Sequence, residues 1–528
     1  MHSGTTQAHP VAHPTALLEE FERYTDRTLF VHEGQEITYG KARAEIFRLA
    51  RALAECGLRP GDGVAGLNVN TPRMMFVHFA AQLIGCYYVG VPLAASTVER
   101  ARMLAHARTS ALVYEPALDT GGMRELAEKS GVDMVLSLGL STTGRDLMEL
   151  AALRSADPLT PLARNENVAE LVFTGGSSGG KPKAATDTFE RIGALAEYWN
   201  IAARENTPDY AVYSTGSCRL LRFIAHIGAP GLSVVPTMLH GGTIVLQEGF
   251  DACTVLRTIE QERITAMVLF PSCSYQLLDH PDLDTTDTSS LRLLVYHGAP
   301  IAPARLEQAG KRFGPILFQS YGQTETRMIS ALYPAGHVTG RPEPLRSAGR
   351  PRTGVEVQIR RDGTPLSPGQ AGEICVRSPY VMNGYWHEPE LTVRTMGDGW
   401  LRTGDAGYLD TEGYLYLVDR LRDVVIVNAS NVYTLEIEDL LTSHPDITQA
   451  AVIGLPDERT GESVHASVVA RPGSAVGEED LRAWVRDRGD ARQEPQTVTF
   501  LEAIPLTPLG KPDKNAIRAE LARRIDEH

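Results

Sequence analysis

The chain has 528 residues, too many for one ordinary domain and enough for several hydrophobic cores. Hydrophobic residues make up 43% and charged residues 22%, a balance that excludes disordered and fibrous classes. The formal net charge of −14 argues against nucleic acid or an anionic membrane as a partner. No apolar run reaches the roughly 18 residues of a membrane-spanning helix, and the polar N-terminus has no secretory signal pattern. We therefore expect a cytoplasmic, multidomain protein.

Six cysteines are spread widely along the chain, without a C-x-x-C pair and without histidines at zinc spacing. This distribution excludes a disulfide scaffold or a structural zinc site as the first interpretation. They are Cys56, Cys86, Cys218, Cys253, Cys273 and Cys375.

The first half of the chain alternates helix and strand patterns. Residues 39–54 have apolar positions at helical spacing, and after a Gly/Pro turn residues 63–68 are typical of a short buried strand. A second helix is expected over 74–83, followed by the apolar run 86–92. This alternation predicts an α/β class with packed, largely parallel sheets.

The pattern changes near residue 355. Short strands over 355–360 and 373–377, separated by turns, predict a small β-rich subdomain. Beyond residue 420 we expect a small α+β unit, and a tight hinge at the boundary gives domains 1–420 and 421–528. Its helices are expected over 435–443, 478–488 and 513–525, and its strands over 450–454, 463–470 and 497–501.

The strongest motif is the run V-F-T-G-G-S-S-G-G-K-P-K at residues 172–183. Glycines let backbone N–H groups approach a polyphosphate, hydroxyls add donors, and lysines add positive charge. The run also fits G-x-x-x-x-G-K, but Pro182 stands where a P-loop NTPase needs a Mg²⁺-binding Ser or Thr. The simpler alternative is a flexible surface loop.

This run resembles the phosphate-binding signature of the adenylate-forming superfamily, which includes acyl- and aryl-CoA ligases, peptide-synthetase adenylation domains and luciferases. One extra residue precedes the Pro-Lys pair, and Ala184 replaces the usual glycine after it. Four further family blocks follow in the family's order: Y-G-Q-T-E at 321–325, T-G-D at 403–405, V-D-R-L-R-D at 418–423 and P-L-T-P-L-G-K at 505–511.

The resemblance implies that an acid is joined to the α-phosphate of ATP with release of pyrophosphate. Positive groups and hydrogen-bond donors would stabilise the charge that develops on the phosphates. Glu325 would ligate Mg²⁺, and Thr324 would donate to the α-phosphate. The β- and γ-phosphates would be held by Thr174, Ser177, Ser178, Gly179 and Lys183.

The nucleoside would be bound by the other blocks. Tyr321 would stack on the adenine opposite Gly298, Ala299 and Pro300. Asp405 would accept both ribose hydroxyls, and Arg420 would contact the ribose or a phosphate. The alternatives without nucleoside binding are that Tyr321 is an aromatic residue of the core and that Asp405 is a residue of a turn.

By the same resemblance, Lys511 would bridge the acid carboxylate and the α-phosphate oxygens, with Lys514 as a nearby alternative lysine. The C-terminal domain would rotate after adenylation about Arg422, where Lys or Asp is usual, and so carry Lys511 away.

Two regions depart from the family or are hard to align. After the hinge, Asn428 and Ala429 stand in place of two glycines that let the pantetheine arm of CoA pass. His226 and Gly228 fall where the acid pocket is usual, although an alignment with residues 214–218 is also open. His226 is either a pocket wall or a core histidine. The small residues favour a compact, aromatic acid.

The leading hypothesis is therefore adenylation of a small or aromatic carboxylic acid, followed by transfer to CoA. The alternative is transfer to an amine, a carrier-protein thiol or, as in ATP-dependent diazotases, activation of nitrite for an aryl amine. A third possibility is a regulatory nucleotide-binding protein without catalysis, which the presence of Glu325, Asp405, Arg420 and Lys511 disfavours.

Overall fold

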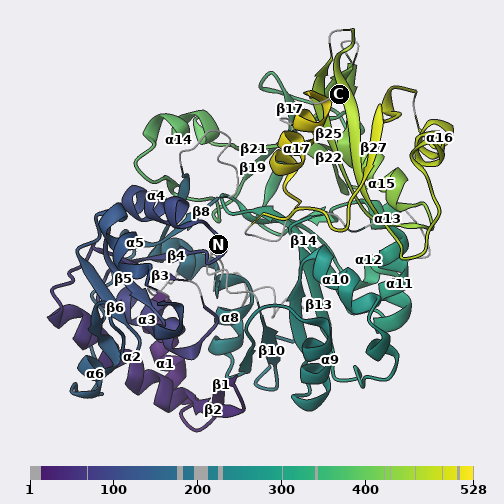
Figure 1. Cartoon of the computed structure of the whole chain (residues 1–528). Coiled ribbons are helices and arrows are strands. Elements are labelled where there is room, and N and C mark those ends of the chain that lie inside the picture. Colours follow the sequence, from purple (N-terminus) through teal and green to yellow (C-terminus); the bar gives the residue numbers. More distant parts are fainter. Residues whose placement is uncertain are drawn as a thin grey trace, which may run out of the picture.

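The computed structural model describes residues 13–67, 69–119, 121–174, 182–195, 212–213, 215–223, 230–299, 301, 303–338, 343–420, 423–427, 430–457, 459–489, 491–507 and 512–526. Two large sheets with helices form the lower body of the molecule in Figure 1, and the C-terminal unit lies above the half that contains β13 and β14. No helix among these residues combines the length and apolarity needed to cross a bilayer.

The first large sheet is parallel except at the edge where β9 and β20 pair antiparallel. Its order is β20 (Gly384–Tyr385), β9 (Ala184–Thr188), β8 (Val168–Phe173), β4 (Tyr87–Val91), β3 (Gly63–Leu67), β5 (Thr109–Tyr114), β6 (Met134–Ser137) and β7 (Arg145–Asp146). The helices of this half are α1 (His13–Arg23), α2 (Tyr39–Glu55), α3 (Pro72–Leu83), α4 (Thr97–Ala107), α5 (Met123–Ser130) and α6 (Leu147–Ala152).

The second large sheet is parallel at its centre, and its edges β2 and β15–β16 are antiparallel. Its order is β16 (Arg350–Pro351), β15 (Arg327–Leu332), β14 (Leu317–Gln323), β13 (Leu293–His297), β12 (Ala266–Leu269), β10 (Arg219–Arg222), β11 (Thr243–Leu246), β1 (Thr28–His32) and β2 (Gln35–Thr38). Its helices are α8 (Pro230–Leu239), α9 (Ala252–Gln261), α10 (Pro271–Leu278), α11 (Pro303–Phe313), α12 (Pro334–His337) and α13 (Glu343–Arg346).

Helix α3 is buried because it packs between the two large sheets. The Thr71 hydroxyl accepts a hydrogen bond from the Met74 amide and Pro72 occupies the first turn, which fixes the start of the helix. All of its residues except Arg73 are buried, and its Phe76 ring lies 5.8 Å from the Phe30 ring of β1. One hydrophobic core therefore serves both sheets.

The predicted β-rich subdomain is an antiparallel sheet that carries two of the predicted site residues on adjacent strands. Its order is β18 (Thr364–Pro365), β17 (Glu356–Arg361), β19 (Gly372–Arg377), β21 (Leu401–Leu409) and β22 (Leu415–Arg420), and helix α14 (Pro389–Met396) precedes β21.

The C-terminal unit has its own core, as expected from the sequence. Its sheet has the order β24 (Ser430–Val432), β23 (Val425–Val427), β26 (Gly461–Ala470) and β25 (Ile447–Asp457), with β27 (Thr497–Phe500) parallel to β26. The helices are α15 (Thr434–Thr442), α16 (Glu478–Arg488) and α17 (Lys514–Asp526), so each predicted helix is found within one residue of its expected ends. Strand β25 is longer than expected because it forms a long hairpin with β26.

Asn70 connects the two large sheets. It follows β3 of the first sheet and is 3% exposed. Its Nδ2 donates to the carbonyl of Arg222 at 2.5 Å and to that of Gln247 at 2.9 Å, and its Oδ1 accepts from Arg222 Nε at 3.2 Å. Arg222 ends β10 and Gln247 follows β11, so one amide side chain satisfies buried polar groups across the junction.

We predict that Asn70→Ala destabilises the protein by roughly 2–5 kcal/mol, because it removes three hydrogen bonds from a buried junction. Scanning calorimetry should show a midpoint of thermal unfolding lowered by several degrees. Gln35→Ala on the exposed face of β2 is the control, with a change within about 0.5 kcal/mol. An unchanged midpoint for Asn70→Ala would contradict the role of this amide.

Candidate active site

The glycine-rich run connects two antiparallel strands. Thr174 follows β8 and Lys183 precedes β9, and the Thr174 amide donates to the Lys183 carbonyl at 2.9 Å. Residues 175–181, with Ser177, Ser178 and Gly179, lie outside the described residues. A P-loop joins a strand to a helix, whereas this run joins β8 to its antiparallel neighbour. The topology therefore excludes the P-loop NTPase alternative.

Thr324 and Glu325 lie in the tight turn between β14 and β15. The Tyr385 hydroxyl donates to Glu325 Oε1 at 2.8 Å, and the Met382 amide donates to the Glu325 carbonyl at 2.7 Å. Tyr385 belongs to β20, which pairs with β9 next to Lys183. Burial, together with the Glu325 charge, raises the pKa of Tyr385 above its ordinary value, so the phenol stays a donor. The carboxylate of Glu325 is thus held beside the glycine-rich hairpin.

The Asp405 carboxylate is held by two hydrogen bonds and one ion pair, and the residue is 7% exposed. Its Oδ2 accepts from the Tyr321 hydroxyl and from Gln323 Nε2, both at 2.7 Å. Arg420 Nε lies 3.5 Å from Oδ1, and the two residues are register partners on β21 and β22. Since a carboxylate offers about four lone pairs, Oδ1 retains acceptor capacity for a ligand hydroxyl.

Two of the other residues predicted to bind the nucleoside, Gly298 and Ala299, lie near Tyr321. Gly298 and Ala299 follow β13, which is parallel to β14, and His297 is in register with Ser320 just before Tyr321. The carboxyl ends of these parallel strands therefore bring Gly298 and Tyr321 together, at the edge where ligands bind in open α/β sheets. Gly298 has φ +94°, which favours glycine at this position. Pro300 lies outside the described residues.

A buried ion network joins the two segments that are predicted to face phosphates. Arg327 follows the Glu325 turn with φ +58°, and its guanidinium pairs with Glu170 of β8 at 3.1 Å and with Asp187 of β9. Arg191 also pairs with Asp187 and donates to the Tyr380 carbonyl at 2.8 Å. The side chains of these four charged residues are at most 6% exposed. The network thus ties the β8–β9 hairpin to the β14–β15 turn.

Several predicted residues lie outside the described part of the chain: the acid-pocket candidates His226 and Gly228, the hinge residue Arg422, and Lys511. Lys514 is described, and it is engaged elsewhere. Its ammonium lies 2.8 Å from Glu438 and donates to the Thr434 hydroxyl at 2.7 Å. A lysine committed to these partners is a poor candidate for the role predicted for Lys511.

Gln323 and Tyr385 contact the candidate site residues Asp405 and Glu325, and the sequence motifs did not reveal these contacts. Gln323 occupies the variable position of Y-G-x-T-E, and its Nε2 also donates to the Thr403 carbonyl at 2.9 Å. Tyr385 is 60 residues from Glu325 in sequence. No spacing rule connects such distant residues, and Tyr385 reaches Glu325 through the β9–β20 pairing and the Met382–Glu325 backbone bond.

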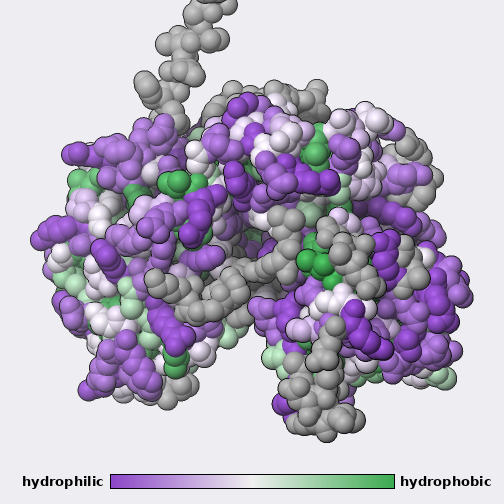
Figure 2. Space-filling model, turned by 90° about the horizontal axis from the view of Figure 1, so that it is seen from above, coloured by the Kyte–Doolittle hydropathy of each residue, from purple (hydrophilic) through white to green (hydrophobic). Residues whose placement is uncertain are grey.

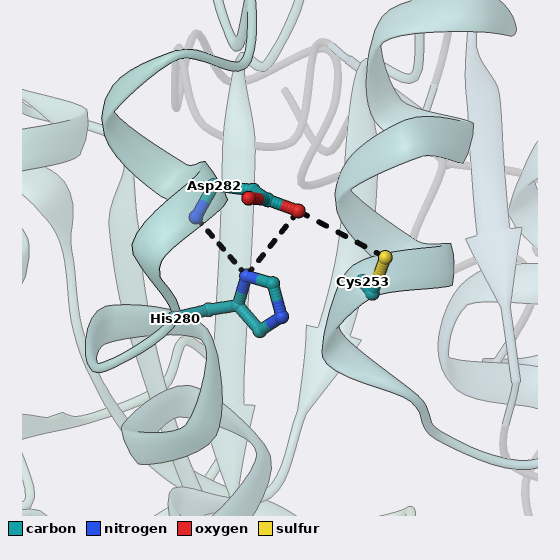
Figure 3. Close-up of side chains that lie close together, drawn as sticks. All are labelled: Cys253, His280 and Asp282. Atoms are coloured by element: carbon teal, nitrogen blue, oxygen red, sulfur yellow. Dashed lines mark hydrogen bonds and ion pairs between the residues drawn. The ribbon is translucent and has the colours of Figure 1, made fainter.

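A second group of ligating side chains lies away from this site, on α9 and the 3₁₀ helix η2 (Pro281–Asp284). Figure 3 shows Cys253, His280 and Asp282 with their side chains facing one another. His280 Nδ1 accepts from the Asp282 amide at 3.2 Å, and Arg257 donates to Cys253 Sγ at 3.4 Å. These contacts already occupy His280 Nδ1 and Cys253 Sγ, and the positive charge of Arg257 would repel a metal ion there.

We predict that Glu170→Ala destabilises the fold by about 3–5 kcal/mol, because it removes one carboxylate and leaves excess buried positive charge from Arg327 and Arg191. Thermal unfolding of the variant is the measurement. Glu166→Ala, an exposed acid four residues earlier, is the matched control and should leave the midpoint nearly unchanged. Equal midpoints for the two variants would argue against a structural role for the network.

The chain is similar to known families and proteins over nearly its whole length. Residues 17–386 match the AMP-binding enzyme family, and residues 436–511 match the AMP-binding enzyme C-terminal domain. The chain is 33% identical to a medium/long-chain-fatty-acid–CoA ligase of Mycobacterium tuberculosis, over 98% of this chain and 91% of the relative. It is 34% identical to a feruloyl-CoA synthase of Amycolatopsis, over 92% and 94% of the two chains.

Among solved structures, the chain is similar to the amide bond synthetase McbA of Marinactinospora thermotolerans, with 40% identity and a TM-score of 0.85. The match covers 96% of this chain and 99% of that structure. The family match extends over more than half of the chain, and it agrees with the order of the motifs and the topology around Asp405 and Glu325. The chain therefore belongs to the AMP-binding enzyme family, within the adenylate-forming superfamily that its sequence motifs indicate.

Proposed function

We propose that this protein uses ATP and Mg²⁺ to adenylate a small aromatic carboxylic acid and then transfers the acyl group to an amine. The observation that carries the first step is the convergence of Asp405, Tyr321, Gln323 and Arg420 at the strand ends, beside Glu325 and the β8–β9 hairpin. These groups fit the ribose, adenine and phosphates of one nucleotide. The division into domains 1–420 and 421–528, the latter a lid turning about Arg422, belongs to this proposal.

In the first step an oxygen of the acid carboxylate bonds to the α-phosphorus of ATP, and pyrophosphate leaves. Asp405 accepts the ribose hydroxyls through its free lone pairs, and Tyr321 packs against the adenine. Thr174, Lys183 and the residues of the hairpin donate to the phosphates, and Thr324 donates to the α-phosphate. Glu325 fits the hard oxygen ligation that Mg²⁺ prefers, and the ion offsets phosphate charge when bound.

In the second step the acceptor nitrogen attacks the carbonyl carbon, AMP leaves, and the nitrogen loses a proton. Two observations favour an amine. The chain is 40% identical to an amide bond synthetase over nearly its whole length. In addition, Asn428 and Ala429 stand in place of the glycines that let a pantetheine arm pass. An aromatic acid is supported by the similarity to a feruloyl-CoA synthase.

CoA is the second candidate acceptor. It is favoured by the names of the curated relatives, which include acid–CoA ligases at 33% and 34% identity. The two proposals share the adenylation step and differ only in the nucleophile. They are therefore separated by product analysis and not by any test of nucleotide binding.

The distinguishing experiment incubates the enzyme with Mg-ATP and a panel of aryl and aliphatic acids, with an amine, with CoA, or with neither. Nitrite with an aryl amine completes the panel. Mass spectrometry should detect an amide and AMP in the amine samples. A CoA thioester without any amide would contradict the amine as acceptor and support CoA. No AMP from any acid would contradict adenylation itself.

We predict that Asp405→Asn weakens ATP binding about 10- to 100-fold, since hydrogen bonds to a charged acceptor contribute roughly 1.5–3 kcal/mol. Isothermal titration with ATP is the measurement. Asp362→Asn, an exposed acid in the β17–β18 turn, is the control and should bind as the unmodified protein does. Unweakened binding by Asp405→Asn would remove this residue from the site.

We predict that Lys511→Ala slows acid-dependent ATP–pyrophosphate exchange by roughly 10²–10³-fold, the usual cost of losing a preorganised donor in the transition state. ATP affinity should stay nearly unchanged, because the lysine acts on the reacting groups. Lys311→Ala, on the exposed end of α11, is the control. Full exchange activity in Lys511→Ala would contradict the assignment of Lys511 to the adenylation step.

A further inference from the structure

Lys514, the first residue of α17, is held in a network of fixed partners. Its ammonium lies 2.8 Å from a Glu438 carboxylate oxygen, and both side chains are 16% exposed. It also donates to the Thr434 hydroxyl at 2.7 Å. Burial lowers the pKa of Lys514, but the charges of Glu438 and Asp419 outweigh this effect and raise the pKa overall. The lysine is therefore a stable cation inside the protein.

Through Thr434 the network reaches the last strand before the hinge. Thr434 is fully buried, its amide donates to Asp419 Oδ2 at 2.5 Å, and its hydroxyl also bonds the Asp419 carboxylate. Asp419 is the neighbour of Arg420 on β22, and successive side chains of a strand point to opposite faces. Arg420 therefore faces Asp405, whereas Asp419 faces α15 and α17 of the C-terminal unit.

Lys514 also lies next to the base of the segment that contains Lys511. Leu506 and Pro512 form a β-bridge, and the Asp513 amide donates to the Pro505 carbonyl at 2.8 Å. The Asp513 carboxylate then accepts from the amides of Asn515 and Ala516, which starts α17. The two described ends of the segment around Lys511 are thus joined to each other and to Lys514 within a few residues.

We propose that Lys514 is a positioning residue for adenylation: with Thr434, Glu438 and Asp419 it fixes the base of the Lys511 segment relative to the strand that carries Arg420. The inference rests on the proposed function, because it assigns Lys511 to the first half-reaction. We assign Lys514 no contact with either substrate. Its ion pair with Glu438 couples α17 to α15, and the Glu438 carboxylate also accepts from the Val452 amide of β25 at 2.8 Å. The Thr434–Asp419 bonds couple both helices to β22.

The test compares the two half-reactions in Lys514→Met, whose side chain has a similar length and no charge. Acid-dependent ATP–pyrophosphate exchange should slow roughly 10- to 100-fold, as expected when a reacting group is misplaced by about 1 Å. The KM for ATP should change little, because the groups around Asp405 are intact. Transfer from chemically prepared acyl-adenylate to the acceptor should stay within about twofold, since Lys511 has no part in that step.

Two further variants guard against a simple loss of folding. Thr434→Val removes only the hydroxyl that links Lys514 to Asp419, and it should reproduce the selective loss of exchange. Lys514→Arg keeps the charge and should recover part of the activity. Lys311→Met, at an exposed lysine, is the control for the loss of a charge.

The failure of the inference is distinct from that of the proposed function. If Lys511→Ala keeps full exchange activity, the assignment of Lys511 fails. If Lys511→Ala is slow while Lys514→Met is normal, the positioning role fails and the function stands. Equal slowing of both half-reactions by Lys514→Met would mean structural support only and would overturn the inference. In the double variant Lys511→Ala/Lys514→Met, exchange should be no slower than in Lys511→Ala alone.

Discussion

The pairing of Arg327 with Glu170 and Asp187 is the interaction on which the site depends most. It joins a turn of the second large sheet to a hairpin of the first, and both segments carry residues predicted to face phosphates. Charges buried this deeply are tolerated only when each has its partner, so alternative arrangements of the two segments are strongly disfavoured. The left-handed backbone at Arg327 is kept in place by the same contacts.

This constraint gives the candidate site a fixed geometry before any ligand binds. Glu325 is held by Tyr385, and Asp405 is held by Tyr321, Gln323 and Arg420. Preorganised groups of this kind stabilise developing charge without reorganising during the reaction. These donors come from three different sheets, so the candidate site forms only when the sheets pack together. On the face seen in Figure 2, hydrophilic residues predominate among the coloured atoms, and hydrophobic residues form only small, scattered patches.

Strand β22 serves two purposes through the alternation of its side chains. Arg420 turns toward Asp405 in the N-terminal body, and Asp419 turns toward Thr434 in the C-terminal unit. Burial raises the pKa of Asp419 to about 6, while the positive charge of Lys514 acts in the opposite direction. Because this pKa lies below 7, the carboxylate is ionised at neutral pH. The position of the C-terminal unit is therefore linked directly to the strand that carries Arg420 of the candidate site.

The order of the motifs predicted the family and the fold class, and periodicity predicted the helices of the C-terminal unit to within one residue, because these signals are local in sequence. The mismatch at Pro182 likewise disfavoured a P-loop before the antiparallel hairpin excluded it. The roles of Tyr385, Gln323 and the Glu170–Asp187 pair depended on strand pairing between segments far apart in the chain. In the sequence Lys514 was only a lysine near Lys511, and the tertiary structure revealed its contacts with Glu438 and Thr434. The sequence by itself determined which chemical groups are present and in what order, whereas the tertiary structure decided which of them meet, since contacts across sheets follow from packing and register and not from spacing.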